Sequence, residues 1–244
     1  TRMSGFRPHA GADDVWWRLA LQVEEAFLDG TELAGVSFDY KKCFNLIPQK
    51  ILFKLVRQMG LDEGVARALE GMYRDIQRRW CLSGGAVGDA WRATNGVLQG
   101  CPLSIVLLNC MVAVWARDVE ASGEVEASAY ADDTTCVAEG AGSVERIARA
   151  VARTLEFAQL TGQEIHTTKS VSWATTAGLR EELAHIQIHG EPLPVSKEAE
   201  VLGAGILMDH NPNHQTKMAT KRKDKLAKKA ERVATVAAGV EVRG

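Results

Sequence analysis

Two short apolar segments in the middle of the chain, residues 125–130 and 134–138, are separated by only Ala131, Asp132 and Asp133. Strand-forming segments on both sides of so short a connection predict a β-hairpin with a tight turn. This pattern therefore predicts two adjacent antiparallel strands at the centre of the chain. Aspartate is common in turns, so turn chemistry alone would explain an isolated Asp-Asp pair.

The elements on either side of this hairpin predict the fold class. Apolar residues at helical spacing predict helices over residues 13–29, 48–59, 62–78, 102–121 and 143–161, with Ser143 as a cap, and a basic helix from residue 213. Further strands are expected over residues 33–39, 79–82, 90–93, 164–173 and 186–189 and around 201–203. Helices that return to a small, mostly antiparallel sheet predict an α+β fold.

Composition excludes some classes of protein and leaves others open. Five cysteines, with no CxxC spacing, argue against a disulfide framework or a zinc site and favour a reducing compartment. The longest apolar run, residues 106–116, is interrupted by Asn109 and is too short to span a membrane, so no membrane partner is expected. The chain begins at Thr1 without an initiator methionine, which suggests a piece of a longer protein.

Charge is distributed unevenly along the chain. The formal net charge is −2, yet residues 217–232 hold eight basic residues against Asp224 and Glu231, a local net of 8 − 2 = +6. A basic segment beside an acidic body suits a metal site next to a phosphate-contacting arm. Composition by itself favours a solvated, charged helix.

A third aspartate has an unusual position. Asp39 ends the apolar segment 33–39, between Phe38 and Tyr40, where a carboxylate is costly unless it has a partner. Adjacent Asp132 and Asp133 repel each other at their turn. A divalent cation would relieve both costs, and carboxylates are hard ligands suited to Mg²⁺ or Mn²⁺.

Three segments occur in an order that strengthens this interpretation. They are, along the chain, residues 38–44 (FDYKKCF), 96–104 (GVLQGCPLS) and 130–133 (YADD). Together they resemble motifs A, B and C of reverse transcriptases, and the middle motif is most similar to the non-LTR (LINE-type) retrotransposon branch. Weaker matches are residues 168–170 (TKS) to motif D, 201–203 (VLG) to motif E, and 5–8 (GFRP) to the end of the fingers.

The resemblance implies a polymerase right hand with a ferredoxin-like palm sheet. Residues 1–32 would be partial fingers, 33–208 the palm with inserted fingers helices, and 209–244 the start of a helical thumb. Asp39 and Asp132 would hold two Mg²⁺ ions, with Mn²⁺ as an alternative, and Asp133 would support them. In two-metal sites the ions lie roughly 3.5–4 Å apart and stabilise the attacking and leaving oxygens.

The same resemblance assigns roles to residues around the nucleotide. Phe44 matches the steric gate, an aromatic ring that clashes with the 2′-OH of a ribonucleotide. The alternative interpretation is an aromatic residue of the core. Gln99 and Gly100 match the loop that lines the nascent base pair. Lys169 matches the motif D lysine that contacts the triphosphate, although a surface lysine is an equal alternative. Three further residues match positions that contact the nucleotide or the primer end, namely Lys42, Tyr130 and Arg7.

The basic tail completes the predicted nucleic-acid contacts. Spacings of three and four place most of its cations on one helical face, namely Lys221, Lys225, Lys228, Lys229 and Arg232. We expect this face to grip the template–primer backbone through phosphates.

The resemblance also implies the partners of the chain. These are an RNA template, a DNA primer or nicked target DNA, and deoxynucleoside triphosphates, with an endonuclease elsewhere in one polyprotein. The site of action would be intracellular, and nuclear in a eukaryote. Two alternatives stay open: an inactive remnant that only binds nucleic acid, which the short fingers favour, and a group II intron or retron-type reverse transcriptase.

Overall fold

A six-stranded sheet forms the centre of the computed structural model, which describes residues 2–3, 11–209, 216, 219–220, 223–228 and 230. The strands lie in the order β1-β5-β6-β2-β7-β10. Their bounds are Arg2–Met3 (β1), Glu126–Tyr130 (β5), Asp133–Glu139 (β6), Leu33–Phe38 (β2), Val171–Ala174 (β7) and Val195–Ser196 (β10). The four inner strands are antiparallel, and the two-residue edge strands pair in parallel. The expected α+β class is therefore confirmed.

Strand β2 lies between β6 and β7 and is almost completely buried. Its Gly35 pairs with Trp173 of β7, and a Cβ at position 35 would overlap the Trp173 indole ring. Glycine is therefore required here because the large ring of the neighbouring strand covers the position.

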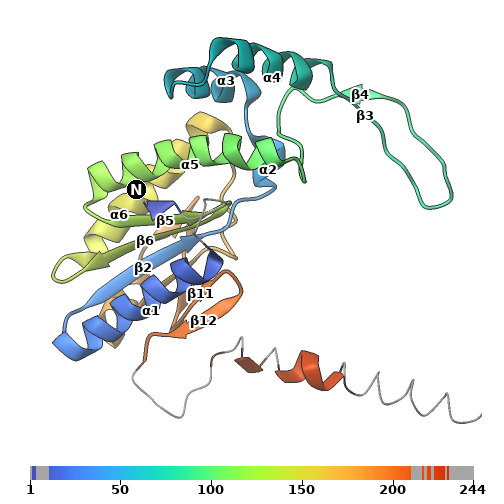
Figure 1. The fold of residues 1–244 in the computed structure, drawn as a ribbon. Helices are drawn as coiled ribbons and strands as arrows, with labels where there is room; N and C mark the ends of the chain where they lie inside the picture. Colours follow the sequence, from blue (N-terminus) through green and yellow to red (C-terminus); the bar gives the residue numbers. More distant parts are fainter. Residues whose placement is uncertain are drawn as a thin grey trace, which may run out of the picture.

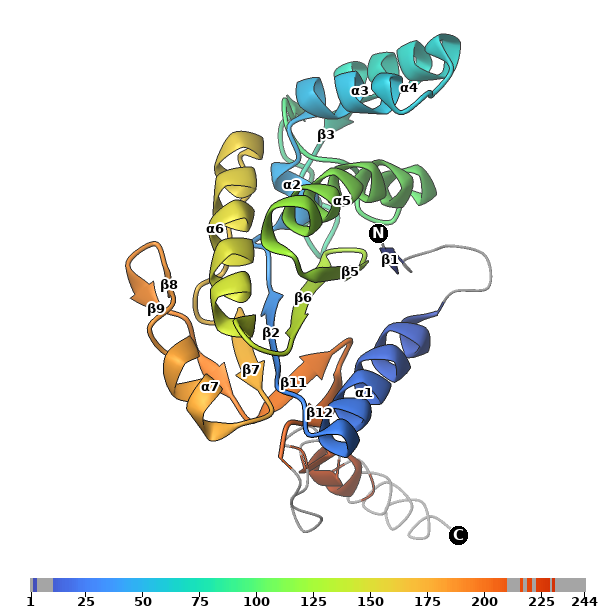
Figure 2. The ribbon, with the colours of Figure 1, turned by 90° about the vertical axis from the view of Figure 1, so that its left-hand side faces the viewer.

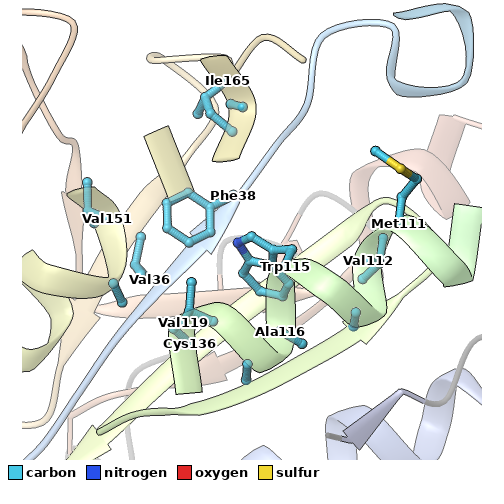
Figure 3. Packing of buried hydrophobic residues seen from close by; sticks show 14 of the residues in the cluster. Val36, Phe38, Met111, Val112, Trp115, Ala116, Val119, Cys136, Val151 and Ile165 are labelled. Atoms are coloured by element: carbon cyan, nitrogen blue, oxygen red, sulfur yellow. The ribbon is translucent and has the colours of Figure 1, made fainter. Parts of the chain in front are cut away.

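Helices α5 (Pro102–Gly123) and α6 (Ser143–Thr161) pack together on one face of the sheet (Figure 1). Figure 3 shows how Trp115 of α5 lies beside Phe38 of β2, and their rings meet edge to face with centroids 6.3 Å apart. The Trp115 indole N–H donates to Thr154 Oγ1 of α6 at 3.0 Å, so the ring is buried without losing its hydrogen bond. The main core thus forms between β2, β6 and these two helices.

By length and composition, α5 could cross a membrane: it has 22 residues and a mean hydropathy of 1.4. Its buried residues include Leu108, Met111, Trp115 and Val119, which belong to the main core. Packing against α6, α3 and β5 accounts for this apolar composition without a membrane.

The opposite face of the sheet is covered by helix α1 (Ala12–Asp29) and the hairpin of β11 (Glu198–Val201) and β12 (Ala204–Leu207), as Figure 2 shows. Val15, Leu19 and Val23 of α1 are buried in a second cluster with Trp173. Helix α7 (Ala177–Leu183) and the short hairpin β8 (Gln187–Ile188) and β9 (Glu191–Pro192) connect β7 to β10.

Three helices and a hairpin are inserted between β2 and α5. They are α2 (Cys43–Leu46), α3 (Gln49–Gln58), α4 (Glu63–Asp75), and the pair β3 (Gln77–Arg78) and β4 (Trp91–Arg92). Figure 1 shows α3 and α4 above α5, with the β3–β4 hairpin projecting away from the rest of the molecule.

Most predicted elements are present, with four differences. The strand expected over residues 79–82 is wrong: β3 comprises Gln77–Arg78, and of the expected residues only Cys81 forms a bridge, to Val87. Helix α4 ends at Asp75 rather than residue 78, because Ile76 is extended and the next two residues pair with β4. Ser143 does not cap α6; Gly142 occupies the cap position with left-handed backbone, and Ser143 is the first helical residue. Residues 202–203 form the turn between β11 and β12 rather than part of a strand.

Candidate active site

The register of the sheet brings Asp39 and Asp133 together. Phe38 is opposite Thr134 where β2 pairs with β6, so the next residue, Asp39, lies beside Asp133 at the same end of the sheet. Tyr130 pairs with Asp133, which leaves Ala131 and Asp132 as a two-residue turn. Ala131 has the positive φ (55°) that such tight hairpin turns require. All three predicted carboxylates therefore lie at one end of the sheet.

These carboxylates influence one another electrostatically. Burial, followed by the negative charges of Asp132, Asp39 and Glu200 in that order, raises the pKa of the Asp133 carboxyl to about 6. The Lys169 ammonium lies 3.6 Å from Asp39 Oδ2, but both side chains are largely exposed, so this ion pair contributes little stability. The site concentrates negative charge that the single lysine does not balance.

Residues 164–170 hold the segment that follows β2. The Asp39 N–H donates to Ser170 Oγ (3.1 Å), and the Asp39 carbonyl accepts from the His166 N–H (2.7 Å). The Lys41 N–H donates to the Glu164 carbonyl at 2.8 Å. These bonds fix the backbone at Asp39 and explain why Lys169 lies close to its carboxylate.

A cavity of about 450 Å³ opens beside these carboxylates. Its lining includes Asp39, Asp133 and Lys169 together with Glu198 and Glu200 of the β11–β12 hairpin. The sequence interpretation missed both glutamates. Their spacing of two residues places them on the same face of a strand, but nothing in the sequence indicates that this hairpin folds over the end of the sheet.

Three hydrogen bonds attach the loop that precedes α5 to α2, to Ile47 at the end of α2 and to the first residue of α3. Gly96 N–H donates to the Ile47 carbonyl and Val97 N–H to the Phe44 carbonyl, both at 2.7 Å, and Gln49 Nε2 donates to the Gly96 carbonyl at 2.8 Å. Gly96 has φ +85°, and a Cβ there would lie 2.7 Å from the Asn45 carbonyl oxygen. Only glycine allows so close an approach of the two backbones.

Helix α4 holds the same loop from the other side. The buried Tyr73 hydroxyl lies 3.0 Å from Ser104 Oγ and accepts a long hydrogen bond from the Leu98 N–H at 3.4 Å. Gln99 and Gly100, which follow directly, are exposed. Tyr73 and Gln49 therefore position the loop, and no sequence signal distinguishes either of them from an ordinary helical residue.

The remaining predicted residues are placed as follows. Phe44 is half-buried against the main core, Tyr130 is half-buried against the second cluster, and Lys42 is exposed with left-handed backbone before α2. In the tail, Lys225 and Lys228 are exposed helical residues. Four predicted contacts lie outside the described residues: Arg7, Lys221, Lys229 and Arg232.

The donor chemistry fits divalent cations, although the site is not a closed cage. In the described part of the chain, no three acidic, histidine or cysteine side chains are already arranged around one point as metal ligands. Mg²⁺ binds through one or two carboxylates and takes its other ligands from water and substrate phosphates. Asp39 and Asp133, which line the cavity, match that number of carboxylates, and their mutual repulsion is the condition that a cation relieves. Asp132 lies in the adjacent turn and is not among the residues that line the cavity.

Solved structures with a similar fold include apo telomerase from Candida tropicalis truncated from its C-terminal domain, with a TM-score of 0.58 and 15% identity over 84% of this chain and 39% of that one. Telomerase from Candida albicans in complex with the TWJ fragment of telomeric RNA matches with a TM-score of 0.60 and 12% identity, over 84% of this chain and 34% of that one. The chain thus spans less than half the length of these telomerases, and the likeness concerns the fold. Residues 1–206 match the family model described as reverse transcriptase (RNA-dependent DNA polymerase). The chain therefore belongs to the reverse transcriptase family.

Proposed function

We propose that this chain is the polymerase part of a non-LTR retrotransposon protein and synthesises DNA on an RNA template. The observation that carries the proposal is the meeting of Asp39, Asp132 and Asp133 at one end of the sheet, beside an open cavity. Family membership supports the polymerase activity. The retrotransposon type rests on the QGxPxS form of residues 99–104.

In this proposal the primer 3′-OH releases its proton to water, its oxygen joins the α-phosphorus of a deoxynucleotide, and the bond to pyrophosphate breaks. Asp39 and Asp132 would hold two Mg²⁺ ions, and Asp133 would support them. When bound, such ions neutralise charge at the attacking and leaving oxygens. The Lys169 ammonium, beside Asp39 in the same cavity, donates a proton to the leaving pyrophosphate oxygen.

The other predicted residues select and orient the nucleotide. Phe44 lies under the sugar and excludes a 2′-OH, and Gln99 and Gly100 line the nascent base pair. The hydrogen bonds that attach the loop at Gly96 to α2 support this arrangement, because they tie the Gln99 loop to the backbone of Phe44. Lys42, Tyr130 and Arg7 contribute outer contacts to the primer end and nucleotide.

The proposed context is a longer polyprotein that acts inside the cell, in the nucleus of a eukaryotic host. Residues 1–32 are assigned to the fingers, 33–208 to the palm and 209–244 to the thumb, whose cations contact phosphates. An endonuclease of the same protein would supply the nicked target DNA that primes synthesis. The Candida albicans telomerase, which is similar in fold, is in complex with a fragment of telomeric RNA, and this supports an RNA partner for the chain.

Primer extension tests this function. The 244-residue chain is given a poly(rA) template, an oligo(dT) primer, dTTP and Mg²⁺. Asp132→Asn is compared with Glu200→Gln, which removes a carboxylate from the cavity that Asp39 and Asp133 line. We expect extension by the parent, a loss on the order of 100-fold or more in Asp132→Asn, and a far smaller loss in Glu200→Gln. Binding of the hybrid without extension by the parent would instead identify an inactive, nucleic-acid-binding remnant.

A further inference from the structure

The β3–β4 hairpin, residues 77–92, forms an arm that stands apart from the rest of the molecule (Figure 1). Every residue from 79 to 92 is exposed. The arm is held by its own backbone: Gln77 and Arg78 pair with Arg92 and Trp91, Cys81 bridges to Val87, and the Gly88 N–H donates to the Trp80 carbonyl at 2.8 Å. Its exposed side chains are therefore available to bind a partner and do not contribute to the core.

The arm exposes large apolar side chains. Trp80 is 72% exposed, Leu82 68%, Val87 56% and Trp91 42%. Apolar side chains exposed singly are normal, but here four of them gather on one short hairpin, as they do at interaction sites. The arrangement therefore indicates an interaction surface.

The charges on the arm favour nucleic acid as its partner. The arm carries three arginines, Arg78, Arg79 and Arg92, against the single acidic residue Asp89. Among the residues that the structure describes, none of these arginines forms an ion pair. The Arg78 guanidinium lies over the Trp91 ring, 5.5 Å from its centroid. Aromatic rings beside cations are the combination that binds unpaired bases and their phosphates.

The position of the arm suggests which strand it meets. The chain passes from β4 directly into the loop at Gly96, which is attached to α2 and precedes Gln99 and Gly100. Along the chain, the arm therefore directly precedes the loop that, under the proposed function, lines the nascent base pair beside the template strand.

We propose that the arm binds the unpaired template strand, with Trp80 and Trp91 stacking on bases and the three arginines contacting phosphates. The identity of this strand as template rests on the proposed function. Binding of single-stranded nucleic acid by the arm does not, because it depends only on the exposed rings and cations. A second copy of this chain is the competing partner, since Leu82 and Val87 would also suit a protein contact.

Fluorescence anisotropy with two labelled RNA–DNA hybrids tests the arm. One hybrid is blunt, and the other carries a 5′ RNA overhang of about 12 nucleotides, within the length that single-strand-binding surfaces cover. The test variant is Trp80→Ser with Trp91→Ser. The control is Trp17→Ser on α1, where the tryptophan is 57% exposed, between Trp91 and Trp80. Because both tryptophans are exposed and do not belong to the hydrophobic core, the double variant should have the circular dichroism spectrum of the folded parent.

We expect the overhang to tighten binding by the parent and by the control. The double variant should lose roughly 25-fold in affinity for the overhang hybrid, from about 1 kcal/mol for each of two stacked bases, and little for the blunt one. Replacing the three arginines by serine should lower the salt slope of overhang binding by about 2. Equal affinity of parent and double variant for the overhang would overturn the proposal.

Two further readouts separate the alternatives. Sedimentation velocity that shows self-association lost in the double variant, with RNA affinity unchanged, would overturn the proposal in favour of a contact between copies. Asp132→Asn should retain full overhang binding while losing extension. If the parent binds the overhang through Trp80 and Trp91 but never extends a primer, the arm proposal holds and the polymerase proposal fails.

Discussion

Replacing Gly96 by alanine tests how the loop before α5 is positioned. Alanine at φ +85° costs about 1–2 kcal/mol because L-residues with a Cβ disfavour this region. The new Cβ would also lie 2.7 Å from the carbonyl oxygen and 2.9 Å from the Cα of Asn45, which are backbone atoms that side-chain rotation does not move. Overpacking of this kind adds about 1–3 kcal/mol. We therefore expect Gly96→Ala to lower the free energy of unfolding by about 2–5 kcal/mol.

Gly100→Ala is the matched control, because Gly100 has the same φ of +85° but no atom lies within 4 Å of its Cβ position. Gly100→Ala should lower the free energy of unfolding by about 1–2 kcal/mol, which is the cost of the left-handed backbone alone. Guanidinium unfolding followed by tryptophan fluorescence measures both variants, and each kcal/mol should lower Tm by about 2–4 °C in a chain of this size. Equal destabilisation of the two variants would refute the close approach between the loop and α2.

Three further predictions concern the nucleotide, the loop and the tail. Phe44→Ala should let rNTPs compete with dNTPs in extension assays, and an unchanged preference would assign Phe44 to core packing alone. Tyr73→Phe should lower stability by about 1–3 kcal/mol, because it leaves the buried Ser104 hydroxyl without its tyrosine partner, and adding Ser104→Ala should cost little more in a double-mutant cycle. Reversing three tail charges should weaken hybrid binding and flatten its salt dependence, whereas a solvated helix would show neither effect; the residues are Lys225, Lys228 and Lys229.

Local signals in the sequence predict most of the elements. Gly30 and Gly162 end α1 and α6 as expected, and Asp62 caps α4 by accepting from the Gly64 and Val65 N–H groups. These features depend on residues within a few positions of one another, so a single sequence contains them. The hairpin around Asp132 is predictable for the same reason.

Features that depend on contacts between distant segments are not predictable in this way. The edge strands β1 and β10 have two residues each, too few for a pattern, and pair only because the sheet offers an edge. Glu200 enters the cavity because the β11–β12 hairpin folds over the sheet end. Resemblance to a family predicts Asp39 beside Asp132, with Asp133 in support, whereas the register of β2 and β6 places Asp39 beside Asp133.

Counting bound metal ions tests the central claim most directly. The chain is mixed with a hybrid whose DNA primer lacks a 3′-OH, the matching dNTP and Mn²⁺, and electron paramagnetic resonance gives the number of bound ions without any reaction. We expect about two ions per chain in the parent and in Glu200→Gln, as two-metal sites require, and fewer in Asp39→Asn and Asp132→Asn. Equal occupancy in the parent and in both aspartate variants would contradict the assignment of Asp39 and Asp132 as the metal ligands.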